Sequence, residues 1–334
     1  MFPDAPEWIQ ALVLGIVQGL TEFIPVSSSG HLVLVPALAG WERHGIAFDV
    51  ALHVGTLAAL LVFYRADLWG MTRALVGRQP SDERAFYRRL LVLLVVGSVP
   101  VAIVGLTLRG AVESVFAAPT TAAWLLLVTA AVLVGGERIA DRRDAGRRRR
   151  QDPVAETPTA SDAPLAHPAN RLEQPTSAAA NTSGPADGPA EASGDTSDEA
   201  VDPASTRGVG LESLSWRQAV LVGVAQSLAL LPGLSRAGLT ISAGVAAGLS
   251  RSAATRFAFL LGLPAIAGAA VVSIPDVDDL ATISGTELAV GILAAAVSGY
   301  LAIAFLVRLV SRIGIDRFAW YLVPLSALSL VVLR

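Results

Sequence analysis

Long apolar runs recur in both halves of this 334-residue chain, and they restrict its fold more than any other feature. A run of roughly 20 apolar residues is long enough to cross the hydrocarbon core of a bilayer as a helix. Charged residues make up 16% of the chain, below the roughly 25% of ordinary globular proteins, and the mean hydropathy is +0.57. These features exclude an ordinary soluble domain and predict an all-α, polytopic membrane protein.

A polar segment separates the two apolar halves. Residues 141–212 are rich in Pro, Ala, Ser, Thr, Asp and Glu, contain no aromatic residue and show no apolar period. Such a segment buries too little surface to offset its chain entropy, so we expect an acidic, disordered linker there. The linker divides the chain into a first membrane repeat at 1–140 and a second at 213–334.

The two halves open with related segments, LGIVQGLTEFIPVSSSGHLVL and VGVAQSLALLPGLSRAGLTIS. Each reads as an apolar helical start, a proline break, a Ser/Gly-rich turn and a second apolar helix. A shift of 208 positions aligns five residues of the first segment with identical residues of the second: Gly15, Gln18, Leu20, Ser27 and Gly30. Irregular backbone at membrane depth is tolerated only where it lines an enclosed or watery cavity. We therefore expect two re-entrant helical hairpins, at about 8–40 and about 213–249.

Six further apolar runs predict six spanning helices, three in each repeat: 48–65, 88–108, 120–140, 254–273, 286–307 and 318–333. Arginine clusters follow the first and third of these spans, and arginine favours the cytoplasmic side. The connection after the fourth span contains three aspartates and no arginine, as expected outside. We therefore place both termini outside the cell membrane and the linker in the cytoplasm. The hairpins would then enter from opposite sides, as an inverted-topology repeat whose tips meet inside the bilayer.

Ionisable residues inside a membrane are costly and therefore mark functional candidates, here Glu22, His31 and Arg236. Gln18 and Glu22 are four residues apart, so they share one face of a helix that leads to the break at Pro25. This amide and carboxylate suit a divalent cation, Mg²⁺ or Ca²⁺, or the positioning of a proton. The alternative is that Glu22 only forms a buried structural ion pair with Arg236.

The Ser/Gly-rich turns precede the second helix of each hairpin, and the free N–H groups of a helix start attract anions. In the first hairpin we expect that helix to begin near Leu32. Two such helix starts, with the planar guanidinium of Arg236, would form a phosphate or diphosphate site. The alternative is that the serines only cap the helices. The candidate substrate-binding residues are Gln18, Ser27, Ser29, Gly233, Ser235 and Thr240.

The residues leave the nucleophile open. The imidazole of His31 can act as nucleophile, general acid or general base. A hydroxyl of Ser27 or Ser28 near it can instead be activated for attack. The candidate catalytic residues are Glu22, Ser28, His31 and Arg236. Asp49 and His53, at the start of the first span, either line the mouth of a cavity or lie at the membrane interface.

These motifs resemble those of the BacA-type undecaprenyl-diphosphate phosphatase family. The first hairpin matches the family's Glu/Gln-x-x-x-Glu element at Gln18 to Glu22 and continues into PVSSSGH. The second hairpin matches the Pro-Gly-x-Ser-Arg-x-x-x-Thr element from Pro232 to Thr240. The resemblance covers about 260 residues outside the linker and departs from the common pattern at three positions: Gln18, Ser29 and Ala237. It implies interdigitated inverted repeats and a phosphatase that uses a divalent cation.

The resemblance also implies roles for individual residues. Carried over by position, Glu22 would be the acid/base or cation-associated carboxylate, and Ser28 or His31 the nucleophile. Arg236 would clamp the phosphate. The supporting hydrogen-bond donors would be Ser235 and Thr240.

The predicted function is an integral-membrane phosphatase. It would hydrolyse the terminal phosphate of an undecaprenyl-type diphosphate to give the monophosphate carrier lipid and inorganic phosphate. The alternative is a transporter or flippase for a phosphorylated lipid or small anion, because inverted repeats with broken helices also build transporters. The expected partners are the lipid substrate and the bilayer, with no nucleic acid. The sequence leaves the oligomeric state open, with a homodimer as one option.

Overall fold

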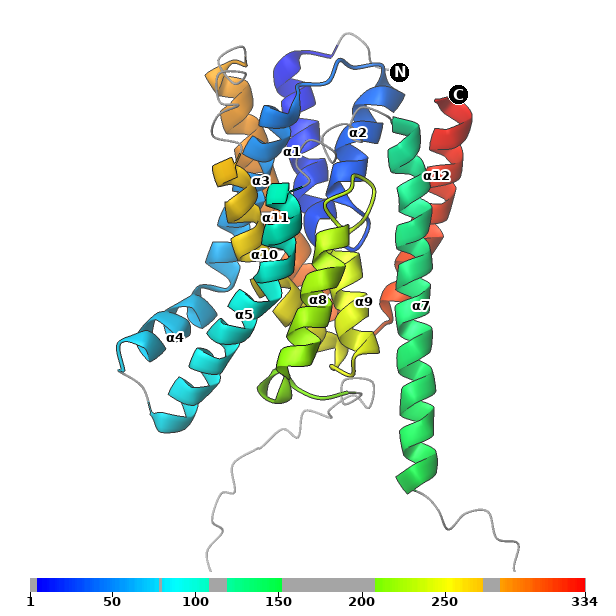
Figure 1. Ribbon diagram of the computed structural model, residues 1–334. Coiled ribbons are helices and arrows are strands. Elements are labelled where there is room, and N and C mark those ends of the chain that lie inside the picture. Colours follow the sequence, from blue (N-terminus) through cyan, green and yellow to red (C-terminus); the bar gives the residue numbers. More distant parts are fainter. Residues whose placement is uncertain (1–4, 78–79, 108–118, 152–207, 273–282, 334) are drawn as a thin grey trace, which may run out of the picture.

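The computed structural model describes residues 5–77, 80–107, 119–151, 208–272 and 283–333 (Figure 1). These ranges are helical and contain no strand, apart from one isolated bridge between Val209 and Leu249. Within them, six helices are long and apolar enough to cross a membrane. An all-α, multi-pass membrane protein with six candidate spans is thereby confirmed.

The helices of the first half are α1 (Glu7–Phe23), α2 (Ser28–Ala39), α3 (Ile46–Phe63), α4 (Arg65–Leu75), α5 (Ser81–Thr107) and α7 (Pro119–Gln151). Those of the second half are η1 (Leu211–Ser213), α8 (Trp216–Leu228), α9 (Arg236–Ala246), α10 (Arg251–Val272), α11 (Gly285–Val310), η3 (Ile315–Phe318) and α12 (Ala319–Val332). The candidate spans are α3, α5, α7, α10, α11 and the segment Ile315–Val332.

Apolar side chains cover the outside of the bundle. On α5, four side chains three or four residues apart are each at least 49% exposed: Val92, Val95, Val99 and Ile103. A stripe of this kind is unfavourable in water and is stable against lipid chains. The outward face of α5 is therefore a lipid-facing surface.

Small residues bring helices of the two halves together. α1 packs along α11, where a Cβ added to Gly19 would lie 2.6 Å from the backbone nitrogen of Gly299. α8 packs along α5, where a Cβ on Gly223 would overlap the backbone of Gly97. Close approach through small residues is typical of helices packed in membranes. The first helix of each broken pair thus lies against a span of the other half, so the halves interlock.

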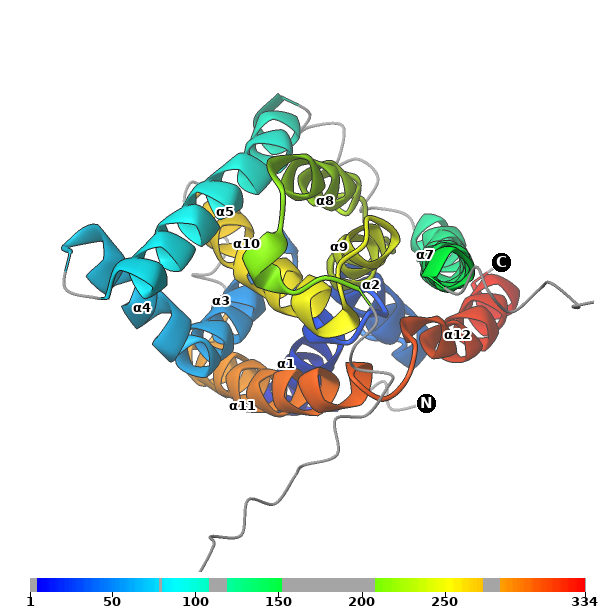
Figure 2. The same ribbon diagram turned by 90° about the horizontal axis from the view of Figure 1, so that it is seen from below.

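In Figure 1 the broken pair α1–α2 occupies the upper part of the bundle, and the broken pair α8–α9 occupies the lower part. α1 begins and α12 ends at the top of this view, whereas α7 ends and α8 begins toward the bottom. Seen from below, α2, α9 and α10 lie toward the centre, and α5, α7, α11 and α12 lie at the periphery (Figure 2). Near this centre, Phe23 of α1 packs on Phe259 of α10, with ring centroids 5.5 Å apart and both side chains fully buried.

The structure differs from the sequence expectations at three places. α4 follows α3 directly and was not predicted; its Asp67 forms an ion pair with Arg256 of α10. α7 continues to Gln151, beyond the boundary expected at residue 140. At the other end of the expected linker, Val209 hydrogen-bonds with Gly248 and Ser250. The remainder of that linker, 152–207, lies outside the described residues.

Candidate active site

The first helical break places a serine-rich turn at the centre of the bundle. Pro25 disfavours helical backbone in the residue before it, and Ile24 is accordingly extended with ψ 136°. Ser27 then takes φ 72°, in the left-handed region. α2 begins at Ser28, one turn before the start predicted near Leu32, so the serines belong to the cap and first turn of the helix.

Serine caps the second helix of each broken pair. The Ser27 hydroxyl accepts a hydrogen bond from the Gly30 N–H at 3.2 Å. At the start of α9, the Ser235 hydroxyl accepts from the Gly238 N–H at 3.0 Å. Both serines therefore act as N-caps, and Ser235 also lines the cavity described below.

The second break is held in place by α7. Gly233 follows Pro232 with φ 98°, a conformation that favours glycine. The Thr129 hydroxyl of α7 donates to the Gly233 carbonyl at 2.9 Å and accepts from the Ser235 N–H at 3.1 Å. A Cβ added to Gly30 would lie 3.1 Å from the Gly233 Cα, so the two breaks are in contact.

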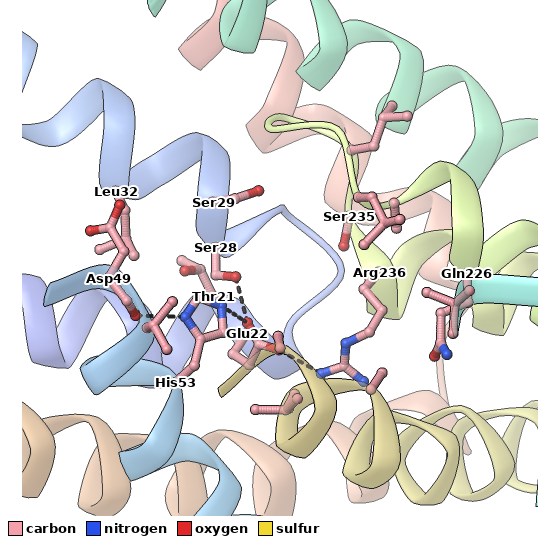
Figure 3. Close-up of a pocket in the computed structure, with 18 of the residues that line it drawn as sticks. Thr21, Glu22, Ser28, Ser29, Leu32, Asp49, His53, Gln226, Ser235 and Arg236 are labelled. Carbon is pink, nitrogen blue, oxygen red and sulfur yellow. Dashed lines mark hydrogen bonds and ion pairs between the residues drawn. The ribbon is translucent and has the colours of Figure 1, made fainter. Parts of the chain in front are cut away.

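A cavity of about 230 Å³ lies between the two breaks (Figure 3). One part of its wall is polar and carries Glu22, Ser28 and His53 from the first half with Gln226 and Arg236 from the second. The other part is apolar and includes Leu32, Ile46, Val50, Val101, Leu230, Leu234 and Ile266. Such a wall suits a ligand with a charged head and an apolar chain.

Glu22 is the centre of the polar wall and is 6% exposed. Its Oε2 accepts hydrogen bonds from the Ser28 hydroxyl at 2.5 Å and from Gln18 Nε2 at 3.1 Å. Its Oε1 accepts from Arg236 Nη2 at 2.5 Å. His53 Nε2 lies 3.5 Å from Oε2. Glu22 is thus placed to take a proton from Ser28 while it balances the charge of Arg236.

Several buried polar atoms at this wall or just behind it have no hydrogen-bond partner among the described residues. Within the described part of the chain, Arg236 Nη1 and both amide atoms of Gln226 are buried and lack a hydrogen bond. The Oε1 atom of Gln18, beside Glu22, is also buried and lacks a hydrogen bond. Buried polar groups are nearly always paired in folded proteins. These atoms therefore point to a ligand, with the guanidinium and amide N–H groups available to an anion.

Five of the predicted site residues line the cavity: Glu22, Ser28, Ser29, Ser235 and Arg236. The other predicted residues lie behind this wall. Gln18 contacts Glu22, Ser27 caps α2, and Gly233 shapes the second break. The hydroxyl of Thr240 donates to the Arg236 carbonyl at 2.7 Å, within its own helix.

His31 does not line the cavity and is 4% exposed. Its Nδ1 lies 2.7 Å from the Ser27 carbonyl oxygen, and its Nε2 lies 2.8 Å from the Tyr321 hydroxyl of α12. Neither partner belongs to the cavity wall. Both nitrogens of this ring are therefore engaged away from Glu22.

Four polar residues that line the cavity were not among the predicted site residues: Thr21, Asp49, His53 and Gln226. Asp49 and His53 were expected either at a cavity mouth or at the interface; both line the cavity, and His53 lies beside Glu22. Its Nδ1 donates to the Asp49 carbonyl at 2.7 Å, which turns Nε2 toward the carboxylate. Gln226 aligns with Gln18 in the internal repeat, and this match was the available signal for it.

Oxygen donors beside Glu22 fit a hard divalent cation. Within the described residues there is no group of three or more His, Cys, Asp or Glu side chains that could hold a metal alone. Glu22, Gln18 Oε1 and the Ser28 hydroxyl nevertheless offer carboxylate, amide and hydroxyl oxygens close together. Mg²⁺ in such sites keeps a few protein oxygens and takes others from phosphate and water.

Comparison with known proteins identifies the family of the chain. The family described as "Bacitracin resistance protein BacA" matches residues 11–163 and 197–328. An "Undecaprenyl-diphosphatase 2" of Stutzerimonas stutzeri (strain A1501) is 35% identical over 325 residues, which cover 97% of each chain. An "Undecaprenyl-diphosphatase" of Geobacter sulfurreducens is 35% identical over 317 residues, covering 94% of this chain and 93% of the relative. A protein named "Undecaprenyl-diphosphatase" from Methanosphaera stadtmanae is 30% identical over 335 residues, covering 97% of each chain. The chain therefore belongs to the BacA family.

Proposed function

We propose that this protein is an integral-membrane phosphatase that hydrolyses the terminal phosphate of undecaprenyl diphosphate in the cavity between the two breaks. One observation carries the assignment of the site: Glu22 joins the Ser28 hydroxyl to the Arg236 guanidinium, at 2.5 Å on each side. Family membership and the names of the relatives support the reaction. The apolar part of the cavity wall suits the prenyl chain.

Ser28 is the proposed nucleophile, because its hydroxyl faces Glu22 whereas His31 is engaged elsewhere. As Oγ attacks the terminal phosphorus, its proton passes to Glu22. The bond from that phosphorus to the bridging oxygen breaks, and Glu22 gives the proton to the departing lipid monophosphate. Glu22 then takes a proton from a water that attacks the phosphorylated Ser28, and returns it to Oγ as inorganic phosphate leaves.

Arg236 and Gln226 are the proposed phosphate-binding residues. Nη1 of Arg236 and the side-chain N–H groups of Gln226 are buried and without a partner in the described part of the chain. Donors fixed in a site of low polarity stabilise charge that develops on a transferred phosphoryl group. The ligand would therefore satisfy the atoms that the folded chain leaves unpaired.

A divalent cation, Mg²⁺ or Ca²⁺, is part of the proposal. Glu22, Gln18 Oε1 and Ser28 would hold it together with oxygens of the diphosphate. When bound, it would neutralise phosphate charge.

If the cation is required, turnover should stop in EDTA and return on addition of excess Mg²⁺ or Ca²⁺. Full turnover in EDTA would contradict a required cation.

The function is tested with purified protein in detergent and a C55 polyprenyl diphosphate. We expect one inorganic phosphate and one lipid monophosphate for each diphosphate consumed. Protein that binds the lipid and releases no phosphate with either cation would contradict the phosphatase. That outcome would favour the transporter or flippase.

Gly262 lies against the Arg236 guanidinium, so a larger residue there would displace the guanidinium without changing any charge. A Cβ added to Gly262 of α10 would lie 2.8 Å from Arg236 Cζ and closer still to Nη1. Because the obstructed group is the end of a flexible side chain, Gly262→Ala should fold and should displace the guanidinium. We expect kcat/KM to fall about 10²-fold, the usual effect of misplacing a catalytic group by about 1 Å.

Gly268→Ala is the matched control, since the same helix has open space within 4 Å of that position. It should retain wild-type kcat/KM. Equal activity of the two variants would show that the position of the Arg236 guanidinium does not limit the reaction.

The membrane arrangement is also proposed. The two broken pairs are re-entrant hairpins of an inverted-topology repeat, with both termini outside and the linker in the cytoplasm. In support, exposed tryptophans stand near the start of α1 and of α8, at opposite ends of the bundle in Figure 1: Trp8 and Trp216. Tryptophan is enriched at both membrane surfaces.

The absence of cysteine from the sequence makes this orientation directly testable. A cysteine at Ala5 should react with an impermeant maleimide in intact cells. A cysteine at Gly210 should react only after the cells are opened. The reverse pattern would contradict the orientation.

A further inference from the structure

The last helix, α12, contacts His31 of α2 through Tyr321. Tyr321 lies on α12, at the edge of the bundle, and its ring stacks on the His31 ring at 5.7 Å with an angle of 11° between their planes. The Tyr321 hydroxyl and His31 Nε2 are 2.8 Å apart. Neither residue lines the cavity, and the proposed reaction uses neither.

The hydrogen bonds fix the state of the His31 ring. A carbonyl oxygen only accepts, so the contact between His31 Nδ1 and the Ser27 carbonyl places the proton on Nδ1. In the neutral ring, Nε2 then has only a lone pair and accepts from the Tyr321 hydroxyl. The Tyr321 hydroxyl therefore pairs with Nε2 in the same tautomer that donates from Nδ1 to the Ser27 carbonyl.

The contact with His31 holds the backbone of Ser27. Ser27 is the one non-glycine residue with positive φ among the described residues, a conformation that persists only where its surroundings impose it. Its carbonyl accepts from both the backbone N–H and the ring of His31, at 3.2 Å and 2.7 Å. The next residue is Ser28, whose hydroxyl bonds to Glu22. The backbone at Ser27 thus decides where the Ser28 hydroxyl points.

We infer that Tyr321 is a positioning residue that acts through His31 on the backbone of Ser27, and so aims Ser28 at the bound phosphate. This inference rests on the proposed function. It makes His31 a positioning residue as well, and not the nucleophile or the general acid. It also gives the last helix a part in the reaction, although it contributes no side chain to the cavity wall.

Tyr321→Phe tests the inference because it removes the hydroxyl and keeps the ring that packs on His31. We expect kcat to fall roughly fivefold to tenfold with KM unchanged, as for the loss of one hydrogen bond. Tyr300→Phe, on α11 and packed against Phe63, is the control and should match the wild type. A wild-type kcat for Tyr321→Phe would overturn the inference.

His31 variants separate positioning from direct chemistry. Asparagine places an amide N–H near the position of Nδ1, so His31→Asn should retain at least tenfold more kcat than His31→Ala. In the His31→Ala background, Tyr321→Phe should have no further effect, because the group through which it acts is gone. An asparagine variant as inactive as the alanine variant, or independent effects of the two substitutions, would overturn the inference.

A spectroscopic measurement tests the inference without any turnover. In protein labelled with ¹⁵N-histidine, the His31 signals are those lost in His31→Asn. Tyr321→Phe should shift the Nε2 signal of His31 and leave the other three histidines unchanged. An unchanged Nε2 signal would overturn the inference, whereas wild-type protein without phosphate release would overturn the proposed function.

Discussion

Arg236→Ala should lower kcat about 10³-fold or more while the protein remains folded. The substitution removes the guanidinium, whose Nη2 bonds to Glu22 and whose unpaired Nη1 we assign to the phosphate. An arginine that stabilises a transferring phosphoryl group commonly contributes this much to the rate. Arg236→Lys should recover little, because a lysine lacks the planar fork that binds two oxygens. The measurement is phosphate release from the C55 diphosphate, with folding checked by size-exclusion chromatography.

A second ion pair provides a matched control for lost stability. Arg251 and Glu137 pair at 2.6 Å, with side chains 14% and 5% exposed, close to the 13% and 5% of Arg236 and Glu22. Breaking a buried pair of this kind destabilises a protein by about 3–5 kcal/mol. Arg251→Ala should therefore lower Tm at least as much as Arg236→Ala and keep most of the wild-type kcat. Similar losses of kcat in both variants would mean that the effect is structural.

Glu22→Gln should lower kcat about 10³-fold with little change in the shape of the cavity. The amide occupies the same space but accepts no proton from Ser28 and carries no charge to balance Arg236. Loss of a general base costs about 10²–10⁴-fold. The same substitution should abolish stimulation by added Mg²⁺ or Ca²⁺ if Glu22 also holds the cation.

Glu137→Gln is the corresponding control. Glu137 is 4% exposed and accepts from Arg251 and from the Ile315 N–H, away from the cavity wall. Its replacement should affect stability and leave the rate of phosphate release near that of the wild type. Glu22→Gln with wild-type turnover would exclude Glu22 as the base.

Periodicity and polarity were sufficient to predict the helical framework. Each long apolar run became a helix, because a chain in lipid must satisfy its backbone hydrogen bonds within the same segment. The proline breaks likewise marked where α1 and α8 end. The ion pair between Glu22 and Arg236, which the sequence raised only as an alternative, is present in the structure.

Other features depended on contacts between distant parts of the chain. α4 is short and has no long apolar run, and its Asp67 meets Arg256, which is 189 residues away. His31 Nε2 meets the hydroxyl of Tyr321, 290 residues later, and the place of His31 in the sequence beside three serines gave no indication of this. Thr129 holds the second break from the interior of α7, where a threonine is otherwise an ordinary helical residue. None of these pairings has a local sequence pattern.

The most direct test of the central claim is phosphate release by the wild type and Ser28→Ala, measured side by side on a C55 polyprenyl diphosphate in detergent. The alanine removes the hydroxyl that lies 2.5 Å from Glu22 and leaves Glu22 and Arg236 in place. We predict one phosphate per lipid from the wild type and at least about 10³-fold slower release from Ser28→Ala, as expected for loss of a nucleophile. Release at the wild-type rate by Ser28→Ala would contradict attack by Ser28 in this cavity.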